Sequence, residues 1–369
     1  MVKCNEIMMK LENLAPVQLA ESWDNVGLLV GDAAQNIQNI MVTLDVTPEV
    51  VREAIAKNTD LIIAHHPMIF SPLKRVVQDG GTGQMIRSLI KNDIGIYASH
   101  TNMDIAFGGL NDILASKLQL EDMKVLDVSA HKKFKKIVVF VPVGHEDAVR
   151  EAMSREGAGW IGNYSDCTYM TKGIGTFRPG EDTNPYIGEK GAVEKVEEYR
   201  VETIIAEDKV KKVIQAMTQA HPYEEVAYDI YPVELEGEPM GLGRIGILPK
   251  PMALAEFINS VKGVLDIDHV RYTGKENRMV SKVAVCTGSG GEYISLCVKL
   301  GADVYVTGEI KYHQAQLAAE AGLNVIAAGH FETENIMVPF LIDYLKNDFE
   351  NEGLHIYPSE CNQGFFKVK

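Results

Sequence analysis

Two adjacent histidines, His65 and His66, follow a short apolar segment at residues 61–64 and precede Pro67. The segment has no polar alternation, which predicts a strand buried on both faces of a sheet. In parallel α/β sheets, ligands bind at the carboxyl ends of such strands, and imidazole is a common metal ligand. The pair therefore predicts a metal site, with hydrogen bonding of both rings to the backbone as the open alternative.

Polar side chains of the same kind follow three further apolar segments of the chain. These three sets are His100 to Asp104, Thr307 to Glu309, and His330 to Glu334. In two of them a histidine precedes a carboxylate by four residues, a spacing at which side chains can converge on one face of a helical turn. In one parallel sheet all four segments would end at the same edge, where we expect these side chains to meet.

The number of ligand-type side chains exceeds what a single zinc ion needs. A set of three or more histidines with two carboxylates suits Zn, Mn, Fe or Ni. The total predicts two divalent metal ions per chain that share a bridging carboxylate. The alternative, a collection of unrelated polar residues at a loop-rich surface, requires four coincidences.

Weaker motifs leave more than one interpretation open. The glycine-rich turn at 288–291 could hold a phosphate with its N–H groups, but it lacks the Lys-Ser/Thr of a P-loop and is equally typical of a tight turn. Lys311 and His313 are either proton-transfer groups near the metals or solvated residues at a helix start. The segment 221–225 has residue types of a metal or ligand motif, but a helix-to-strand turn is the favoured interpretation. Asp24 lies in a turn that could border the cleft.

Composition and charge narrow the class of protein. The 369 residues are too many for one ordinary core, so we expect two domains. The formal net charge of -15 argues against a nucleic-acid partner. The five cysteines are scattered without a CxxC pair, which favours neither a disulfide framework nor a zinc knuckle. The sequence has no apolar signal core and no apolar run of about 18 residues, so we expect a cytoplasmic protein without a membrane partner.

The order of the apolar segments predicts an α/β fold. A strand at 40–45, a helix beginning at Thr47 with Pro48 in its first turn, and the strand at 61–64 make a βαβ unit. Further buried strands are expected at 94–99, 280–287, 303–307 and 325–328. We therefore predict an outer α/β sheet domain formed from both ends of the chain, residues 1–126 and 235–369.

Residues 127–234 have a different pattern, which predicts an inserted ferredoxin-like α+β domain. The element order is βαββαβ, as in that fold. Its strands are expected at 136–143, 168–177, 194–205 and 225–233, and its helices at 145–157 and 208–220. Asp208 is expected to cap the second helix, and a polar loop at 178–185 separates the second and third strands.

These segments resemble a known family, the NIF-three-like proteins, whose members carry the name GTP cyclohydrolase 1 type 2 homologue. The matching motifs are Trp23 to Leu28, His65 to Pro67, Ser99 to Asp104, Thr307 to Glu309, and Gly329 to Glu334. The resemblance implies a two-metal site with His65, His66, Asp104, His330 and Glu334 as ligands. It also implies a toroidal homohexamer with the sites facing its inner cavity, and an insert similar to nitrogen-regulatory and copper-tolerance proteins.

Two functions are compatible with these features. The leading hypothesis is a metal-dependent hydrolase of a small-molecule substrate, in which the ions activate water and polarise the electrophile and His100 or His313 transfers protons. Opening of a purine imidazole ring, as a GTP cyclohydrolase performs it, and phosphoester or amide hydrolysis would use the same groups, so a nucleotide is a candidate substrate. The alternative is a non-enzymatic metal-binding regulatory or adaptor protein whose insert senses a small ligand.

Overall fold

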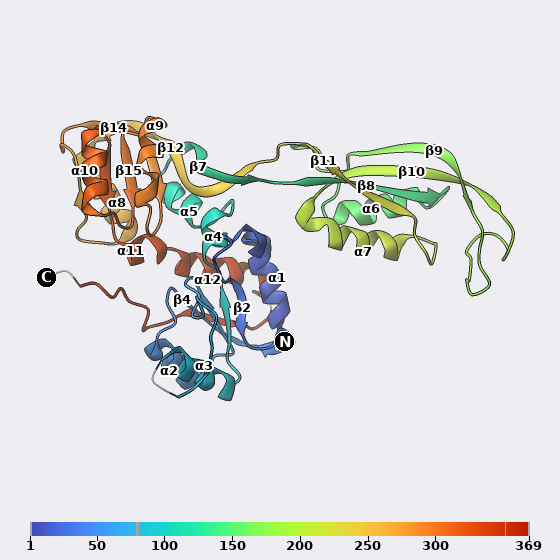
Figure 1. Cartoon of the computed structure of the whole chain (residues 1–369), viewed down its shortest axis with the longest axis horizontal. Helices are drawn as coiled ribbons and strands as arrows, with labels where there is room; N and C mark the ends of the chain where they lie inside the picture. Colours follow the sequence, from blue (N-terminus) through green and yellow to red (C-terminus); the bar gives the residue numbers. More distant parts are fainter. Residues whose placement is uncertain (1, 79–80, 351, 368–369) are drawn as a thin grey trace. The chain divides into compact units, whose positions relative to one another are not determined.

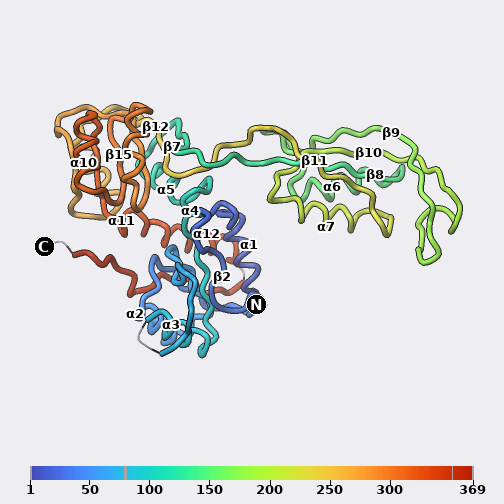
Figure 2. The backbone as a smooth tube through the Cα atoms, viewed as in Figure 1, coloured from blue at the N-terminus to red at the C-terminus, as the bar shows by residue number. Residues whose placement is uncertain are grey.

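The computed structural model describes residues 2–78, 81–350 and 352–367 and has a mixed α/β fold (Figure 1). The chain divides into two compact units: unit 1 consists of Met1–Ser129 and Met240–Lys369, and unit 2 of Ala130–Pro239. In Figure 2 the blue start and the red end of the chain both run through unit 1, whereas the green segment forms unit 2. Within the described ranges, no helix combines the length and the apolar character needed to cross a bilayer.

One sheet of unit 1 has five strands in the order β17-β4-β5-β6-β2. Their bounds are β2 Gly27–Val30, β4 Asn39–Thr43, β5 Leu61–Ala64, β6 Gly95–Ala98 and β17 His355–Pro358. The first four strands of this order are parallel, and β2 pairs with β6 in the antiparallel direction. Because β17 pairs with β4, both ends of the chain contribute to this sheet.

Helices pack around the five-stranded sheet. They are α1 Cys4–Leu14, α2 Pro48–Ala56, α3 Thr82–Lys91 and α12 Met337–Asp348, and a short antiparallel pair of strands, β1 Val2–Lys3 and β3 Asn36–Ile37, lies beside α1. The predicted start of α2 is confirmed: the side chain of Thr47 accepts a hydrogen bond from the N–H of Val50 at 3.2 Å, and Pro48 occupies the first turn, where its missing N–H costs nothing.

The other sheet of unit 1 has six strands in the order β13-β16-β15-β14-β12-β7. Their bounds are β7 Glu121–His131, β12 Pro239–Ala253, β13 Arg271–Tyr272, β14 Met279–Cys286, β15 Val304–Thr307 and β16 Asn324–Ala327. β14, β15 and β16 are parallel, and β12 and β13 are antiparallel to their neighbours β14 and β16. The helices of this half are α8 Leu254–Leu265, α9 Ile294–Lys299 and α10 Tyr312–Glu320.

The expectation that all four ligand-bearing strands belong to one sheet is wrong. β5 and β6 lie in the five-stranded sheet, whereas β15 and β16 lie in the six-stranded sheet. In each half of unit 1, consecutive parallel strands pair with each other, because the connection between them is short. The chain therefore forms two small sheets. Apolar runs of four residues identify buried strands but do not identify the partner strand, which explains the error.

The sequence patterns also missed β7, β12 and α8. β12 contains Pro249 and Pro251, and its pairing with β14 shifts register between Ile247 and Met252. Proline inside an apolar run argues against a strand, and a local bulge accommodates it here. The two strands connect unit 1 to the start and the end of unit 2.

A continuous apolar core joins the two sheets of unit 1. Ile40 and Ile63 of the five-stranded sheet, Val283 and Val306 of the six-stranded sheet, and Leu341 of α12 are fully buried in it. Burial of apolar surface stabilises the folded state by roughly 25 cal/mol per Å². The shared core therefore fixes the carboxyl ends of the two parallel strand sets relative to each other.

Unit 2 has a four-stranded antiparallel sheet in the order β11-β8-β10-β9. Its strands are β8 Phe134–Pro142, β9 Thr168–Phe177, β10 Glu194–Ala206 and β11 Tyr228–Val233, and its helices are α6 Glu146–Arg155 and α7 Val210–Ala220. The helices and the sheet share a core that includes Val139, Val149 and Val213. The predicted Asp208 cap is wrong, because a 3₁₀ turn precedes α7 and the residue before the helix makes no side-chain cap.

A buried ion pair links the two chain segments of unit 1. The guanidinium of Arg244 in β12 donates two parallel hydrogen bonds to the carboxylate of Asp112, Nε to Oδ1 at 2.6 Å and Nη2 to Oδ2 at 2.7 Å. Its remaining donors bond the carbonyls of Ala106, Gly241 and Gly243. Asp112 lies in α5 (Leu110–Lys117), so the pair joins the N-terminal half to the C-terminal half.

Replacement of Arg244 by Met leaves the buried Asp112 carboxylate without its partner. We expect the free energy of unfolding of unit 1 to fall by about 3–5 kcal/mol, the typical cost of breaking a buried pair. The chain has two tryptophans, Trp23 in unit 1 and Trp160 in unit 2. Urea unfolding followed by Trp23 fluorescence in a Trp160→Phe background measures the change.

Arg52→Met is the matched control, because Arg52 pairs with Glu49 on an exposed helix surface where its side chain is 69% exposed. Exposed pairs contribute about 0–1 kcal/mol, so this variant should unfold almost like the parent. Adding Asp112→Leu to Arg244→Met should recover part of the lost stability. Equal effects of Arg244→Met and Arg52→Met would contradict the assigned role of the buried pair.

Candidate metal centre

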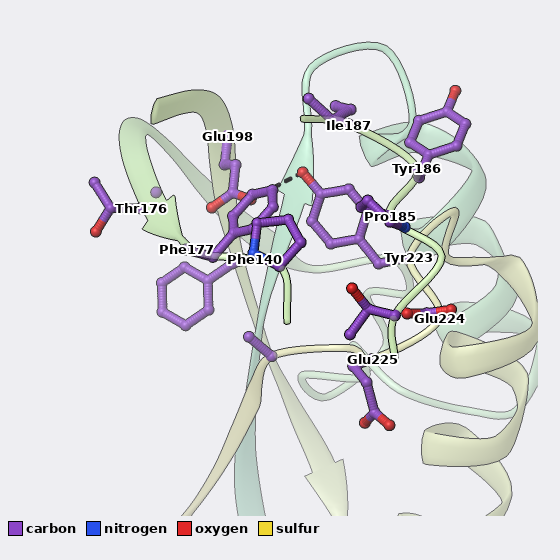
Figure 3. Close-up of a pocket in the computed structure, with 14 residues that line it drawn as sticks. Phe140, Thr176, Phe177, Pro185, Tyr186, Ile187, Glu198, Tyr223, Glu224 and Glu225 are labelled. Carbon is purple, nitrogen blue, oxygen red and sulfur yellow. Dashed lines mark hydrogen bonds between the residues drawn. The ribbon is translucent and has the colours of Figure 1, made fainter. Parts of the chain in front are cut away.

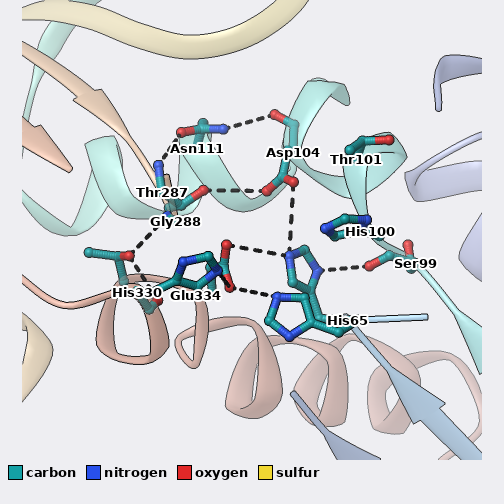
Figure 4. Close-up of polar contacts among 12 residues, drawn as sticks. His65, Ser99, His100, Thr101, Asp104, Asn111, Thr287, Gly288, His330 and Glu334 are labelled. Atoms are coloured by element: carbon teal, nitrogen blue, oxygen red, sulfur yellow. Dashed lines mark hydrogen bonds and ion pairs between the residues drawn. The ribbon is translucent and has the colours of Figure 1, made fainter. Parts of the chain in front are cut away.

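Six ligand-type side chains of unit 1 lie together where strands of its two sheets end (Figure 4). They are His65, His66, His100, Asp104, His330 and Glu334. The first two follow β5 and the third follows β6, while Asp104 lies in the short helix α4 (Thr101–Ile105). The last two begin and end the helix α11 (His330–Glu334), which follows β16. The shared core of unit 1 thus brings together residues that are up to 269 positions apart, from 65 to 334.

The local backbone allows two adjacent histidines to serve one site. β5 ends at Ala64, and residues 65–66 form a bend instead of continuing the strand. Adjacent residues of a regular strand would point to opposite faces of the sheet. At the bend, the rings of His65 and His66 lie with their centroids 5.1 Å apart, and both approach the carboxylate of Glu334.

A sharp turn at Gly329 places the start of α11 against the site. Gly329 has φ of 99°, a conformation that residues with a side chain rarely adopt. Four residues after His330, the end of the same helix carries Glu334 into the cluster, and its carboxylate faces His330. The i, i+4 spacing predicted from the sequence therefore produces the expected convergence.

The carboxylate of Glu334 lies at the middle of the cluster. Its Oε2 is 3.1 Å from Nε2 of His66 and 3.1 Å from Nε2 of His330, and its Oε1 is 3.9 Å from Nε2 of His65. Asp104 Oδ2 lies 3.9 Å from the same nitrogen of His65. A carboxylate between several imidazoles is the arrangement that a bridging ligand requires.

Two overlapping sets of residues have the geometry of a metal site. His65, His66 and His100 form one set, and His66, His330 and Glu334 form the other. Within each set the ligand atoms lie within 4.8 Å of one another. Mixed nitrogen and oxygen donors of this kind suit Zn, Mn, Fe or Ni.

Each histidine ring is held through its Nδ1 atom. Nδ1 of His66 lies 2.8 Å from Oδ1 of Asp45, Nδ1 of His100 lies 2.9 Å from Oδ1 of Asp24, and Nδ1 of His65 lies 2.8 Å from the carbonyl oxygen of Ser99. Nδ1 of His330 lies 3.2 Å from Oε1 of Glu309. With a proton on each Nδ1, every ring presents the lone pair of Nε2, which is the tautomer that a metal ligand needs.

The carboxylates of the cluster are also positioned by neighbours. The hydroxyl of Thr287 donates to Oδ1 of Asp104 at 3.3 Å, and the side chain of Asn111 donates to the carbonyl oxygen of Asp104 at 3.0 Å. Asn111 in turn accepts a hydrogen bond from the N–H of Thr287 at 3.0 Å. These contacts join α4 and α5 to the end of β14, so they couple the two sheets directly at the site.

Burial and charge shift the protonation of the cluster in opposite directions. Complete burial lowers the pKa of His65 to about 3. Burial also disfavours the charged form of His66, but interactions with Asp45 and Glu334 raise its pKa to about 10. Contact with Glu334 outweighs burial at His330 and raises its pKa to about 9. Because a metal ligand must be a neutral imidazole, metal and protons compete for His66 and His330, and metal affinity falls as the pH falls.

The pKa values of the two buried carboxylates, Asp104 and Glu334, are also shifted in opposite directions. Burial and the charge of Glu334 raise the pKa of Asp104 to about 7. Burial would also raise the pKa of Glu334, yet its contacts with His330 and His66 hold that pKa well below the usual range. Divergent pKa values at one buried point are typical of functional sites.

Unpaired buried atoms provide a test of whether these residues fit metal ions. Among the described residues, Nε2 of His65 is buried without a hydrogen-bond partner. Oε2 of Glu334 is buried without a hydrogen bond of acceptable geometry, although the imidazoles of His66 and His330 lie 3.1 Å from it. Buried polar atoms without partners are rare and costly. Divalent ions coordinated by these two atoms would satisfy both of them, so the donor set fits the predicted metal centre.

Most of the residues predicted from the sequence lie in the cluster. The predicted ligands His65, His66, Asp104, His330 and Glu334 all lie in the cluster. His100, predicted for proton transfer, lies at ligand distance beside His65 and His66.

His313 is exposed at the start of α10. Its ring contacts Tyr312, with the centroids 5.6 Å apart, and it makes no hydrogen bond or ion pair with the cluster in the described part of the chain. A role in proton transfer therefore stays a prediction for His313.

Sequence reasoning missed the carboxylates that hold the rings. Asp45 was not predicted, and Glu309 was expected near the site without an assigned partner, although each comes two residues after a buried strand, as several predicted ligands do. Asp24 was placed only at the border of the cleft. It bonds His100 and also both the N–H and the hydroxyl of Thr101, and although burial would raise its pKa, these hydrogen bonds lower it to about 2.

The glycine-rich turn at 288–291 has a packing role. The N–H of Gly288 donates to Thr333 Oγ1 at 3.1 Å, and the N–H of Gly290 donates to Thr307 Oγ1 at 3.1 Å. A Cβ at Gly288 would overlap the carboxylate of Glu334. Both N–H groups are therefore occupied, and the turn lets α11 approach closely instead of holding a phosphate.

Comparison with known proteins identifies the family of this chain. A sequence profile of the Duf34/NIF3 family (NGG1p interacting factor 3) matches residues 2–364. The chain belongs to the Duf34/NIF3 family. This confirms the family resemblance found in the sequence motifs.

Individual members of the Duf34/NIF3 family match over almost the whole chain. The GTP cyclohydrolase 1 type 2 homolog of Bacillus subtilis is 45% identical over 368 residues, which is 99% of this chain and 98% of the relative. The GTP cyclohydrolase 1 type 2 homolog of Halalkalibacterium halodurans is 47% identical over 331 residues, 90% of this chain and 89% of the relative. A crystal structure of a Bacillus cereus protein related to NIF3 is 44% identical, has a TM-score of 0.88, and covers 100% of this chain and 99% of its own.

The carboxylate behind His66 offers a test of the metal centre in this Duf34/NIF3 chain. Asp45→Asn keeps the shape of the side chain but removes the charge that fixes the ring tautomer. We expect the affinity for Zn²⁺ to fall about 10–100-fold, the usual effect of losing such a partner. Competition between the protein and a chromophoric chelator measures the affinity.

Asp93→Asn is the control, because it removes the same charge from an exposed turn outside the cluster. Asp93 has φ of 53°, a conformation that asparagine also tolerates, so the backbone should not change. Its Zn²⁺ affinity should equal that of the parent. An equal loss in both variants would mean that net charge, and not the His66 partner, decides binding.

Proposed function

We propose that this protein is a metal-dependent hydrolase whose centre holds two divalent ions through His65, His66, Asp104, His330 and Glu334. The observation that carries the proposal is the orientation of the imidazoles. Each ring is anchored through Nδ1 and directs Nε2 toward the shared Glu334 carboxylate or the neighbouring rings. In the described part of the chain, Nε2 of His65 is buried without a hydrogen-bond partner, and Nε2 of His66 and of His330 face the Glu334 carboxylate, so a metal ion could be held between these groups.

Two divalent ions held there would lower the pKa of water toward neutrality and polarise the bond that is attacked. Glu334 reaches both sets of ligands, so we assign it as the bridging residue. His100 stands beside His65, with ring centroids 5.1 Å apart, and is tied to Asp24. An imidazole backed by a carboxylate can accept a proton and pass it on, which suits His100 to proton transfer.

The substrate class follows from the names of the relatives and from the chemistry of the site. Curated relatives are named GTP cyclohydrolase 1 type 2 homolog. We therefore propose a small-molecule substrate, with a guanine nucleotide as the first candidate. Hydrolytic opening of a purine ring and hydrolysis of a phosphoester need the same activated water, so both reactions belong in the screen.

A second candidate function is a non-enzymatic metal-binding regulator or adaptor with a ligand-sensing insert. The regulator function is supported by a cavity of about 380 Å³ in unit 2, which is lined by residues of that unit. A regulator would bind metal in unit 1 and a ligand in unit 2 without turnover. The same variants distinguish it from the hydrolase.

Replacement of Glu334 by Ala should remove both metal and turnover. We expect the parent protein to contain two divalent ions per chain by elemental analysis, and Glu334→Ala with His330→Ala to lose at least one of them. Turnover of GTP and of simple phosphoesters at matched metal concentration should fall with the metal, because the ligands act through it. Wild-type metal content in the double variant would show that the site is misplaced.

His221→Ala is the control for this experiment, because His221 lies in unit 2. Its Nε2 bonds the carbonyl of Phe140 at 3.0 Å and its Nδ1 accepts the N–H of Tyr223 at 3.1 Å, which is a structural role in a turn. Its removal should leave turnover nearly unchanged. Equal trace turnover in all proteins would favour the regulator, and loss in His221→Ala alone would move the active site to unit 2.

We infer that unit 2 is an inserted ferredoxin-like domain, with the chain divided at 1–126, 127–234 and 235–369. The βαββαβ element order and the central positions of β8 and β10 support this assignment. The ends of the insert are close together, because the N–H of Lys132 donates to the carbonyl of Glu238 at 3.0 Å. Compact units that meet at such a pair of strands can often be removed as a whole.

Deletion of residues 132–238, with a short Gly-Ser linker between His131 and Pro239, tests this domain assignment. We expect a folded protein that keeps the metal content of the parent, because the ligands and their anchors all lie in unit 1. Elemental analysis and circular dichroism measure both properties. An insoluble or metal-free deletion protein would show that the two units share one core.

Two further properties stay proposals. We expect a reducing, cytoplasmic environment, which is supported by the fact that all five cysteines are free thiols. We also expect a homo-oligomer, with the hexamer implied by the family resemblance as the leading state. Light scattering on the purified protein would decide the oligomeric state, and a monomer would contradict it.

A further inference from the structure

The cavity in unit 2 has walls made largely of aromatic rings (Figure 3). Phe140 of β8, Phe177 of β9, and Tyr186 of the following loop line it together with Tyr223. The ring centroids of Phe177 and Tyr223 are 5.9 Å apart, and those of Tyr186 and Tyr223 are 6.3 Å apart. Aromatic faces carry negative partial charge, so such walls attract cations as well as apolar groups.

A nearly buried carboxylate is part of the wall of this cavity. Glu198 of β10 is 8% exposed and lines the cavity. Its Oε1 accepts a hydrogen bond from the hydroxyl of Tyr223 at 3.2 Å, which Figure 3 marks with a dashed line. In the part of the chain that the structure describes, its Oε2 has no hydrogen-bond or ion-pair partner. A buried carboxylate normally has a cationic or hydrogen-bonding partner for each oxygen, so this oxygen is available to a ligand.

The backbone opposite Glu198 makes room for the carboxylate. Gly173 of β9 pairs with Glu198, and Gly175 lies two residues further along the same strand. A Cβ at Gly175 would overlap the Glu198 carboxylate. A glycine inside a strand weakens the strand, so its presence here indicates a close approach. Gly175 thus keeps the carboxylate at the cavity wall.

The charges around the cavity have one sign. Glu224 and Glu225 also line it, and none of its lining residues is Lys, Arg or His. Three carboxylates without a compensating cation would repel a phosphate or another anion. The nearby His221 does not change this, because both of its ring nitrogens are bonded to backbone groups and burial lowers its pKa.

We propose that the cavity of unit 2 binds a small organic cation, an amidinium or primary ammonium group attached to an apolar body. The cationic N–H groups bond the free oxygen of Glu198, and the apolar body packs against the exposed sides of the rings of Phe177, Tyr186 and Tyr223 that line the cavity. An amidinium can meet a carboxylate through two parallel hydrogen bonds, which gives the site its preference for charge and shape. The volume of about 380 Å³ accommodates a ligand of one ring and a short polar head.

This site is independent of the hydrolase proposal, since all the residues that carry it belong to unit 2. If unit 2 does not bind an organic cation, the proposal of a metal-dependent hydrolase in unit 1 is unaffected. If both are correct, the protein has two binding sites of different chemistry, which is what the regulator hypothesis requires of the insert.

Calorimetric titration of the full-length, metal-loaded protein with three matched probes tests the proposal. Benzamidine carries an amidinium on one ring, benzamide is its neutral counterpart, and benzoate is the anion. We expect benzamidine to bind at least about tenfold more tightly than benzamide, the effect of a charge-assisted hydrogen bond, and benzoate not to bind. Equal binding of benzamidine and benzamide, or no binding of benzamidine at millimolar concentration, would overturn the proposal.

Glu198→Gln should reduce benzamidine affinity at least about tenfold, because it removes the charge but keeps the shape. Glu197→Gln is the matched control: it removes the same charge one residue away, from a side chain that is 66% exposed and pairs with Lys172. Successive strand residues point to opposite faces, so Glu197 cannot reach the cavity. Equal losses in these two variants would also overturn the assignment of Glu198.

Gly175→Ala is a second, charge-preserving variant. Its added methyl group displaces the Glu198 carboxylate, so benzamidine affinity should fall without any change in net charge. Fluorescence of Trp160 in a Trp23→Phe background shows whether unit 2 of each variant is folded. Full benzamidine affinity in folded Gly175→Ala would mean that the ligand does not use the Glu198 carboxylate.

Discussion

The folded structure depends on holding four imidazoles and two carboxylates at one buried point of unit 1. Burial of a charged carboxylate without partners is costly, and two carboxylates at one place repel each other. The protein offsets this cost with the imidazoles of His66 and His330, which contact Glu334, and with the hydroxyl of Thr287, which donates to the Asp104 carboxylate. Metal ions can replace the protons of these histidines, so the same arrangement serves the protein with and without metal.

The cluster takes its side chains from both sheets of unit 1. β5 and β6 supply His65, His66 and His100, whereas β16 leads to the helix that carries His330 and Glu334. Each candidate cluster residue therefore comes from one of two halves, and only the two halves together form the whole cluster. The shared apolar core and the buried pair of Arg244 and Asp112 hold the two sheets together. Loss of that relation would separate the ligands even if each sheet stayed folded.

Unit 2 presents a different chemistry from the metal centre. Its core is its own, and its cavity combines aromatic rings with a nearly buried carboxylate instead of histidines. The motif at 221–225 is part of this arrangement: His221 fixes the turn, and Tyr223 bonds Glu198. A segment that sequence patterns indicate to be only a turn therefore shapes a cavity.

The sequence by itself showed the family and predicted the strands and residues that meet at the candidate metal centre. Ligand-type side chains directly after apolar runs gave this signal, because the ends of parallel strands are where sites form. Only the tertiary structure decided that these strands lie in two sheets, that Asp24, Asp45 and Glu309 anchor the rings, and that Glu198 faces a cavity. Pairing between distant strands and the partners of each ring depend on contacts across the whole fold, and local residue patterns do not contain that information.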